Sequence, residues 1–344
     1  MDNKNIVAAD FRGRRWPAWI SAAAAAALLS AILLAQGPAL AGWFREAYAG
    51  LPLPLRDWLW DVRRIVPWVV QTTYLNPWTY AVVFGVFLLE SLIPINRQQK
   101  PWSVGMVQDL LWAHTDAFFR SVWLPLYLVW LHGVYDRHLS FLTVHLFEGF
   151  SPAVRAVIAF LIFDALNYAH HVVRHRVEFL WRFHMIHHSQ REMNLFTDTR
   201  VHIVEYLAAK TVIFIPMFML QVNVAEVFWL SLAMHWYTGV YHANLKTNYG
   251  LLKYFMVTPQ SHRIHHSVEP RHYEKNFGVF LTVWDRMFGT LYAKYDEYPE
   301  ETGLDDDRLP IEESIAGISV FRTYIRQLIF PFRLLLAPKS RSAS

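Results

Sequence analysis

Long apolar runs separated by polar segments dominate the pattern of this chain. Six such runs stand out, at 17–40, 78–95, 121–135, 153–171, 205–221 and 224–242. A helix needs roughly 20 residues to cross the hydrocarbon of a bilayer, so the pattern predicts an all-α, multi-pass membrane protein with about four to six spans. The chain is accordingly 54% hydrophobic and only 17% charged, where soluble domains carry about a quarter of charged residues.

The first apolar run has two interpretations. Three arginines precede it and an Ala-Leu-Ala sequence at 39–41 ends it, a pattern similar to that of a cleaved signal peptide. The run is longer than the apolar part of a usual signal peptide, so we expect an uncleaved helix. Residues 1–77 are then an N-terminal membrane helix followed by an interfacial segment.

The order of the later runs predicts which parts lie on the same side of the membrane. If 205–221 and 224–242 form a helical hairpin, the polar segments before and after it share one side. Both segments are rich in Lys and Arg, whereas the connection at 222–224 is uncharged. The excess of positive charge predicts that both are cytoplasmic. The membrane would be the inner membrane in a bacterium or the endoplasmic reticulum in a eukaryote.

The C-terminal part has a different pattern from the membrane domain predicted at 78–295. Residues 296–344 begin with an acidic stretch to 307, which predicts a solvated loop. Arginines alternate with bulky apolar residues at 318–338, and this pattern is typical of a basic amphipathic helix on a membrane surface. The last residues are expected to be disordered.

One short histidine motif occurs twice, and its histidines are the candidate functional residues. His-x-x-His-His-Ser stands at 184–189 and again at 262–267. On a helix, positions i, i+3 and i+4 share one face, so each triplet is expected to direct its imidazoles to a common point. Thr258 and Pro259 are suited to the N-cap and first position of a short helix that carries the second triplet.

Clustered neutral imidazoles are metal ligands. His171 and His175, four residues apart, precede the first triplet, and His242 ends the returning hairpin on the same side. The predicted ligands are His171, His175, His184, His187, His188, His242, His262, His265 and His266. This number exceeds what one ion binds and suits two, and imidazole alone is compatible with Zn, Cu, Fe or Ni.

The remaining histidines and one acid are assigned by position. His114, His132, His138 and His145 stand alone and are expected to be structural. His170, His202, His235 and His272 lack a partner at ligand spacing and are expected either to be structural or to support the metal ligands from behind. Asp164 lies within an apolar run, where an ionisable group is costly and indicates function. With Tyr168 it shares the helix face of His171, so we expect these two residues to orient a metal-binding histidine from behind.

Beyond these patterns, 164–189, 242–245 and 258–291 resemble the fatty acid hydroxylase/sterol desaturase superfamily of membrane di-iron enzymes. The three histidine boxes, and the sequence at 276–291 after the third, follow its order. Departures from the usual superfamily residues are Ala169, Val172 and Ile203, and none is a predicted ligand. The resemblance implies two non-haem iron ions held by the nine histidines.

The resemblance also implies a reaction and its partners. Such an enzyme uses O2 to hydroxylate or desaturate a C–H bond of a lipid, such as a fatty acyl chain or a sterol, held in a dry cavity between helices. The chain has no cysteine for an iron–sulfur cluster and no clear nucleotide-binding motif. Electrons are therefore expected from a separate ferredoxin, cytochrome or reductase, and nucleic acid is not an expected partner. The alternative is a membrane transporter or binding protein for zinc or iron.

Overall fold

The computed structural model describes residues 77–100, 102–145, 149–222, 224–306 and 308–336, together with the single positions 67 and 71. The chain divides into two compact units, 1–63 and 64–344, and every described residue belongs to the second. The helix predicted at 17–40 lies outside the described residues. The division predicted at 77 and 295 stays a prediction.

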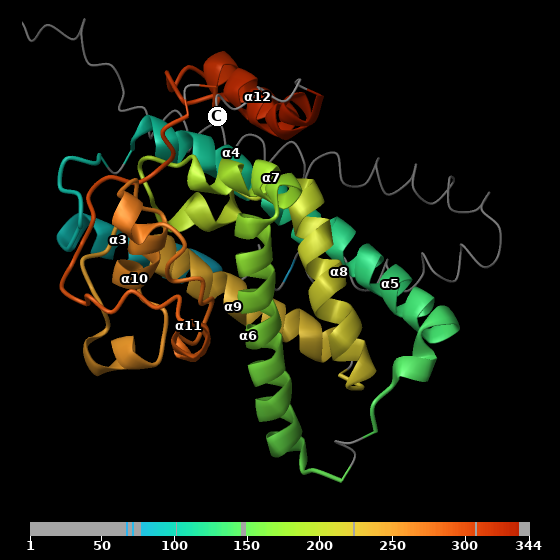
Figure 1. Ribbon diagram of the computed structural model, residues 1–344. Helices are drawn as coiled ribbons and strands as arrows, with labels where there is room; N and C mark the ends of the chain where they lie inside the picture. Colours follow the sequence, from blue (N-terminus) through green and yellow to red (C-terminus); the bar gives the residue numbers. More distant parts are fainter. Residues whose placement is uncertain are drawn as a thin grey trace, which may run out of the picture. The chain divides into compact units, whose positions relative to one another are not determined.

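The described part of the chain is all-α, as predicted, and its only β-type pairings are two isolated bridges. A π-helical turn at Phe119–Trp123 joins the second helix to the third. The helices, labelled as in Figure 1, are α3 (Pro77–Leu92), α4 (Val104–Phe118), α5 (Leu124–His138), α6 (Pro152–Arg176), α7 (Glu178–His188), α8 (Ile203–Met219), α9 (Val224–His242), α10 (Pro259–His265), α11 (Val283–Phe288) and α12 (Gly317–Leu336).

The five apolar runs within the described part correspond to α3, α5, α6, α8 and α9. By length and composition, only α6 among the described helices is sufficient to cross a membrane, and the apolar helix at 79–92 is shorter. The number of spans predicted from the sequence therefore stays a prediction. Ser151 is the N-cap of α6 and its side chain accepts a hydrogen bond from the Val154 backbone, and Pro152 is the first residue of the helix.

Helices α5, α6, α8 and α9 pack around a common apolar core. Leu128, Phe163, Phe214, Met217 and Val227 are almost completely buried there. Each such side chain contributes about 1.5–3 kcal/mol through its removal from water. The hairpin of α8 and α9 brings residue 203 and residue 242 to the end of α6 that carries His171 and His175, as the sequence predicts.

Helix α12 lies across α4 and α7 (Figure 1). The Trp112 indole donates a hydrogen bond of 2.9 Å to Gln327, and its ring contacts Tyr324 edge-on at 4.8 Å between centroids. The opposite face leaves Ile318, Phe321, Ile325, Ile329 and Phe332 exposed. The amphipathic helix predicted at 318–338 is therefore confirmed, ending at residue 336 in the described part.

Candidate metal centre

All nine histidines predicted as ligands come together in two adjoining groups. Within each group, one ring nitrogen from each histidine lies within 4.8 Å of those of the other members. One group has five members from α6, α7 and α10, and the other has four from α7, α9 and the end of α10. The first is His171, His175, His184, His188 and His265, and the second is His187, His242, His262 and His266.

Each triplet is divided between the groups. His184 and His188 join the five-histidine group while His187 joins the other; His262 and His266 join the four-histidine group while His265 crosses over. The expectation that a whole triplet meets at one point is therefore wrong. Helical positions advance by 100°, so i+4 lies 40° from i, whereas i+3 lies 60° to the other side. The middle histidine consequently faces the neighbouring group.

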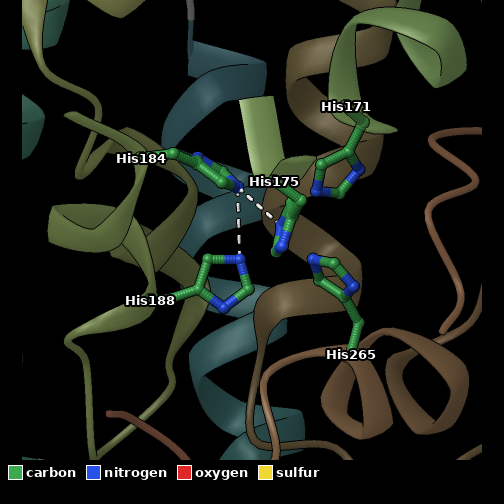
Figure 2. Close-up of side chains that lie close together, drawn as sticks. All are labelled: His171, His175, His184, His188 and His265. Carbon is green, nitrogen blue, oxygen red and sulfur yellow. Dashed lines mark hydrogen bonds between the residues drawn. The ribbon is translucent and has the colours of Figure 1, made fainter. Parts of the chain in front are cut away.

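In the five-histidine group the Nε2 atoms converge (Figure 2). The Nε2 of His184 lies 3.1 Å from that of His175 and 3.2 Å from that of His188. His171 and His265 complete the group from the other side, with their ring centroids 4.5 Å apart. Helix α10, which carries the second triplet, begins as predicted: the Thr258 side chain caps it and Pro259 is its first residue.

In the four-histidine group His242 is central. Its Nε2 lies 2.8 Å from that of His262 and 3.2 Å from that of His187. The Nε2 of His266 lies 3.1 Å from that of His262. His242 thus lies among the predicted ligands although it belongs to no triplet.

The partners of the Nδ1 atoms fix where the protons are. His171, His242 and His265 each direct Nδ1 to a backbone carbonyl oxygen, of Phe277, Thr238 and Lys275 respectively, at 2.7–2.9 Å. A carbonyl oxygen only accepts, so Nδ1 carries the proton and Nε2 presents a lone pair. The Nε2 atoms of His171 and His265 are buried without any hydrogen-bond partner.

This geometry fits bound cations. Lone pairs that converge in a buried space repel one another and remain unsatisfied unless a cation accepts them. Burial, reinforced by neighbouring imidazoles, holds the pKa of His184, His187 and His188 well below the usual histidine range, and Arg174 adds to this lowering at His184 and His187. The rings are therefore in the neutral form that binds a metal.

Two acids behind the rings escaped the sequence analysis. Glu205, in the first turn of α8, accepts hydrogen bonds from Nδ1 of His184 at 2.9 Å and from Arg174 at 2.6 Å. Asp198 accepts one from His235 at 2.8 Å and lies 3.8 Å from His242. The signal for Glu205 in the sequence is an acid at the start of the apolar run 205–221.

Asp164 and Tyr168 have other partners than predicted. The Asp164 carboxylate accepts hydrogen bonds from the backbone of Phe280 and Leu281 and from the Trp284 indole, at 2.8–3.0 Å. Tyr168 shares a hydrogen bond of 2.9 Å with Thr290. Neither residue bonds a histidine. They fasten α6 to the segment after α10, because a carboxylate buried in an apolar helix needs donors and the backbone of this segment supplies them.

The lone histidines lie outside both groups, as expected. His202 caps α8 by accepting from the Val204 backbone at 3.1 Å, and its other nitrogen donates to the carbonyl of Leu328. His272 donates to Glu297 at 2.8 Å. With Glu269 these two form a further group of possible metal ligands, but the Arg271 guanidinium already pairs with both acids.

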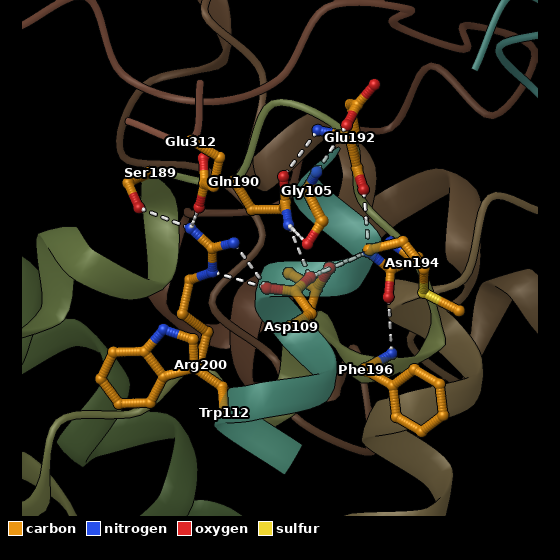
Figure 3. Close-up of polar contacts among 12 residues, drawn as sticks. Gly105, Asp109, Trp112, Ser189, Gln190, Glu192, Asn194, Phe196, Arg200 and Glu312 are labelled. Atoms are coloured by element: carbon orange, nitrogen blue, oxygen red, sulfur yellow. Dashed lines mark hydrogen bonds and ion pairs between the residues drawn. The ribbon is translucent and has the colours of Figure 1, made fainter. Parts of the chain in front are cut away.

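A buried ion-pair network supports the histidine helices from α4 (Figure 3). Arg200 is fully buried, and its guanidinium donates to Asp109 at 2.7 Å, to Ser189 at 3.2 Å and pairs with Glu312 at 2.5 Å. Asp109 also accepts from Gln190 at 2.6 Å. Because Ser189 directly follows the first triplet, this network holds the end of α7 in place.

A cavity of about 120 Å³ lies beside the histidines, between α6, α8 and α9. His171 from the five-histidine group and His187, His242 and His262 from the other line it. Most of its other walls are polar. Its remaining polar wall residues include Arg120, Asn167, His170, Arg174, Asp198, Glu205, Lys210, Ser231, His235 and Thr238.

Comparison with known proteins points to one family. The model of the fatty acid hydroxylase family matches residues 156–290, which include all nine histidines. Alkylglycerol monooxygenase of Danio rerio is 30% identical over 150 residues, 41% of this chain and 31% of that protein. Ornithine lipid hydroxylase OlsE of Rhizobium tropici is 28% identical over 140 residues, 41% of this chain and 42% of that protein.

A third relative extends the similarity. Very-long-chain aldehyde decarbonylase GL1-1 of Oryza sativa subsp. indica is 28% identical over 185 residues, 51% of this chain and 28% of that protein. This chain thus spans less than half the length of each of these relatives. No solved structure matches it. The resemblance drawn from the histidine boxes is confirmed.

Proposed function

We propose that this chain, which belongs to the fatty acid hydroxylase family over residues 156–290, is a membrane-bound, non-haem di-iron oxidoreductase that uses O2 to hydroxylate a C–H bond of a lipid. The observation that carries the proposal is the division of nine buried histidines into two adjoining groups of five and four. Each group offers enough nitrogen ligands for one ion, and imidazole is suited to iron. The names of the relatives, a monooxygenase and a lipid hydroxylase among them, support an oxygen-dependent reaction on a lipid.

The reaction has a definite balance. A C–H bond is broken, one oxygen atom enters it, and the other leaves as water, so that R–H, O2, two electrons and two protons give R–OH and H2O. The irons, when bound, would pass the electrons from the donor to O2. Desaturation would need the same inputs and release two waters. Since the chain has no cysteine for an iron–sulfur cluster, the electrons come from a separate ferredoxin, cytochrome or reductase.

The protein residues hold the site rather than react. Glu205 fixes the ring of His184 and neutralises Arg174 beside it. The carbonyls of Phe277 and Lys275 keep Nε2 of His171 and His265 free for metal. Partners of this kind raise ligand basicity and set ring orientation.

The proposed enzyme is embedded in a membrane. Helix α6 is long and apolar enough to span it, and the histidines lie at one end of α6. The apolar face of α12 would rest on the lipid surface at that end. We place the histidine-rich end on the cytoplasmic side, because its segments carry the excess of Lys and Arg.

The alternative of a metal transporter is less well supported. A transport path would need ligands along the middle of a helix bundle. Here the nine ligands gather in two compact groups, and their Nδ1 atoms are held by backbone and carboxylate partners.

Metal analysis tests the proposal. The chain purified from cells grown with both iron and zinc is expected to contain about two irons. The competing result is bound zinc, because a catalytic zinc needs only three protein ligands. His187→Ala should lower the iron content and abolish lipid hydroxylation. His138→Ala, at the exposed end of α5, is the matched control and should change neither. Unchanged turnover in His187→Ala, or no bound iron after reconstitution, would contradict the proposal.

A further inference from the structure

The segment between α11 and α12 contacts the residues around both histidine triplets. It comprises residues 299–312, all described except 307, and we call it the connecting segment. It lies beyond residue 290, where the match to the family model ends. Its contacts fall on the residues inside the two triplets and on those that directly follow them. A role for this segment at the metal centre is therefore a property of the C-terminal part of this chain.

The connecting segment holds the second triplet through Arg263, which is one of the two residues inside that triplet and is almost completely buried. The Arg263 guanidinium donates hydrogen bonds to the carbonyl oxygens of Pro299 at 2.6 Å and Glu300 at 2.9 Å. The backbone N–H of Gly303 donates to the carbonyl oxygen of His266 at 3.2 Å. Helix α10 is therefore fastened to the connecting segment at the end that carries the metal ligands.

The same segment holds the first triplet through an apolar contact and an ion pair. Leu309 shares a buried apolar cluster with residues 185–186, which lie inside that triplet. Glu312 pairs at 2.5 Å with the buried guanidinium of Arg200, which also donates to Ser189 directly after the triplet (Figure 3). The connecting segment therefore fastens α7 as well as α10.

Thr302 joins the ends of the two triplets. Its backbone pairs in an antiparallel bridge with Ser267, which follows the second triplet. Its buried hydroxyl lies 3.2 Å from the carbonyl oxygens of Gln190 and Arg191, just after the first triplet. The next residue, Gly303, has a φ of +115°, and a Cβ atom there would lie 2.9 Å from Cγ of Arg191. Only glycine suits this conformation and this close approach.

From these contacts we infer that the connecting segment is a clasp that retains the metal ions, an inference that rests on the proposed metal centre. Each group of ligands takes histidines from both triplets. Separation of α7 from α10 would therefore withdraw ligands from both ions at once. Because Thr302 is bonded next to both triplets, it opposes this movement. Thr302 is a positioning residue, and it touches neither a metal ligand side chain nor substrate.

The rate at which iron passes to a chelator measures this role without turnover. The iron-loaded full chain in detergent is mixed with ferrozine in the absence of air. Thr302→Val removes the hydroxyl and nearly keeps the size of the side chain, so iron release should be about three- to tenfold faster, as expected for lost hydrogen bonding. Thr143→Val, which removes a hydroxyl bonded to Tyr135 beyond the end of α5, should leave the rate unchanged. Equal rates in the two variants would overturn the inference.

Two neighbouring acids provide a second matched pair, which decides the question if Thr302→Val does not fold. Glu312 pairs with the buried Arg200, whereas Glu313 is exposed. Iron release should be faster in Glu312→Gln and unchanged in Glu313→Gln. Gly303→Ala should also release iron faster, because its methyl group would push the connecting segment away from Arg191. Release at the wild-type rate in both Glu312→Gln and Gly303→Ala would overturn the clasp.

Hydrogen exchange on the metal-free chain distinguishes a clasp from a general contribution to stability. In Thr302→Val, the amides of 184–191 and 258–267 should exchange faster than in Thr143→Val, while those of α5 exchange at the same rate in both. A rise spread evenly over the chain, or no change at all, would overturn the inference. Normal iron content with release at the control rate refutes only the clasp. Bound zinc in place of iron refutes only the di-iron proposal, since the same variants then test the release of zinc.

Discussion

His188 and His266 stack face to face, with ring centroids 4.2 Å apart and an angle of 18° between the planes. They are the last histidines of the two triplets, and they belong to different groups. This contact is one of several ring contacts that join the two groups, and together they make the two proposed metal sites a single packed unit.

Removing the acid behind His184 should weaken metal binding without unfolding the chain. Glu205→Gln keeps the shape of the side chain but not its charge, so it holds the His184 ring less strongly and leaves Arg174 unneutralised. We expect metal affinity to fall about 10–100-fold, measured by chelator competition. Glu178→Gln, whose acid is exposed, is the control. Identical chelator curves for the two variants would show that Glu205 has no part in metal binding.

Asp164→Asn should affect stability rather than metal content. The carboxylate accepts three hydrogen bonds, and an amide that presents its NH2 to those donors leaves at least one unsatisfied. The expected loss is about 1–3 kcal/mol, measured by denaturant unfolding in detergent. Asp136→Asn, at an exposed pair with His132, should cost less than the change at Asp164. Iron lost from the folded Asp164→Asn chain would instead favour the role originally predicted.

The buried arginine should be among the most sensitive positions. Arg200→Met leaves the Asp109 carboxylate buried without its cation, and such a change costs about 3–5 kcal/mol. The same substitution at Arg308, an exposed partner of Asp306, is expected to cost below about 1 kcal/mol. Denaturant unfolding of the two variants provides the comparison, and equal midpoints would show that the Arg200 network adds nothing to stability.

The outer face of α12 should contact lipid. Because the chain has no cysteine, a single cysteine at Ile325 or at Ser314 can carry a spin label without background. In proteoliposomes, we expect the label at Ile325 to be relaxed by oxygen, which concentrates in lipid. The label at Ser314, which is exposed before the helix begins, should respond to a water-soluble nickel reagent. A water-exposed Ile325 would exclude the surface position proposed for α12.

The sequence was informative where the chemistry is local and uninformative where it depends on tertiary contacts. The apolar runs, the cap at Thr258 and the histidine spacing are short-range patterns, so the helices and the set of clustered histidines followed from them. The partners of Asp164 lie more than a hundred residues away, and no periodicity indicates them. The division of each triplet also depends on how α7 faces α10, which a helix considered alone does not determine.

The crossed triplets also constrain the maturation of the protein. His265 completes the group otherwise built by α6 and α7, and His187 completes the group otherwise built by α9 and α10. Neither group is whole until α10 has been synthesised, and the four-histidine group also needs His242 at the end of α9. Metal insertion is therefore expected to follow synthesis of all nine ligands, and a truncated chain that ends before α10 would lack a full set of ligands for either ion.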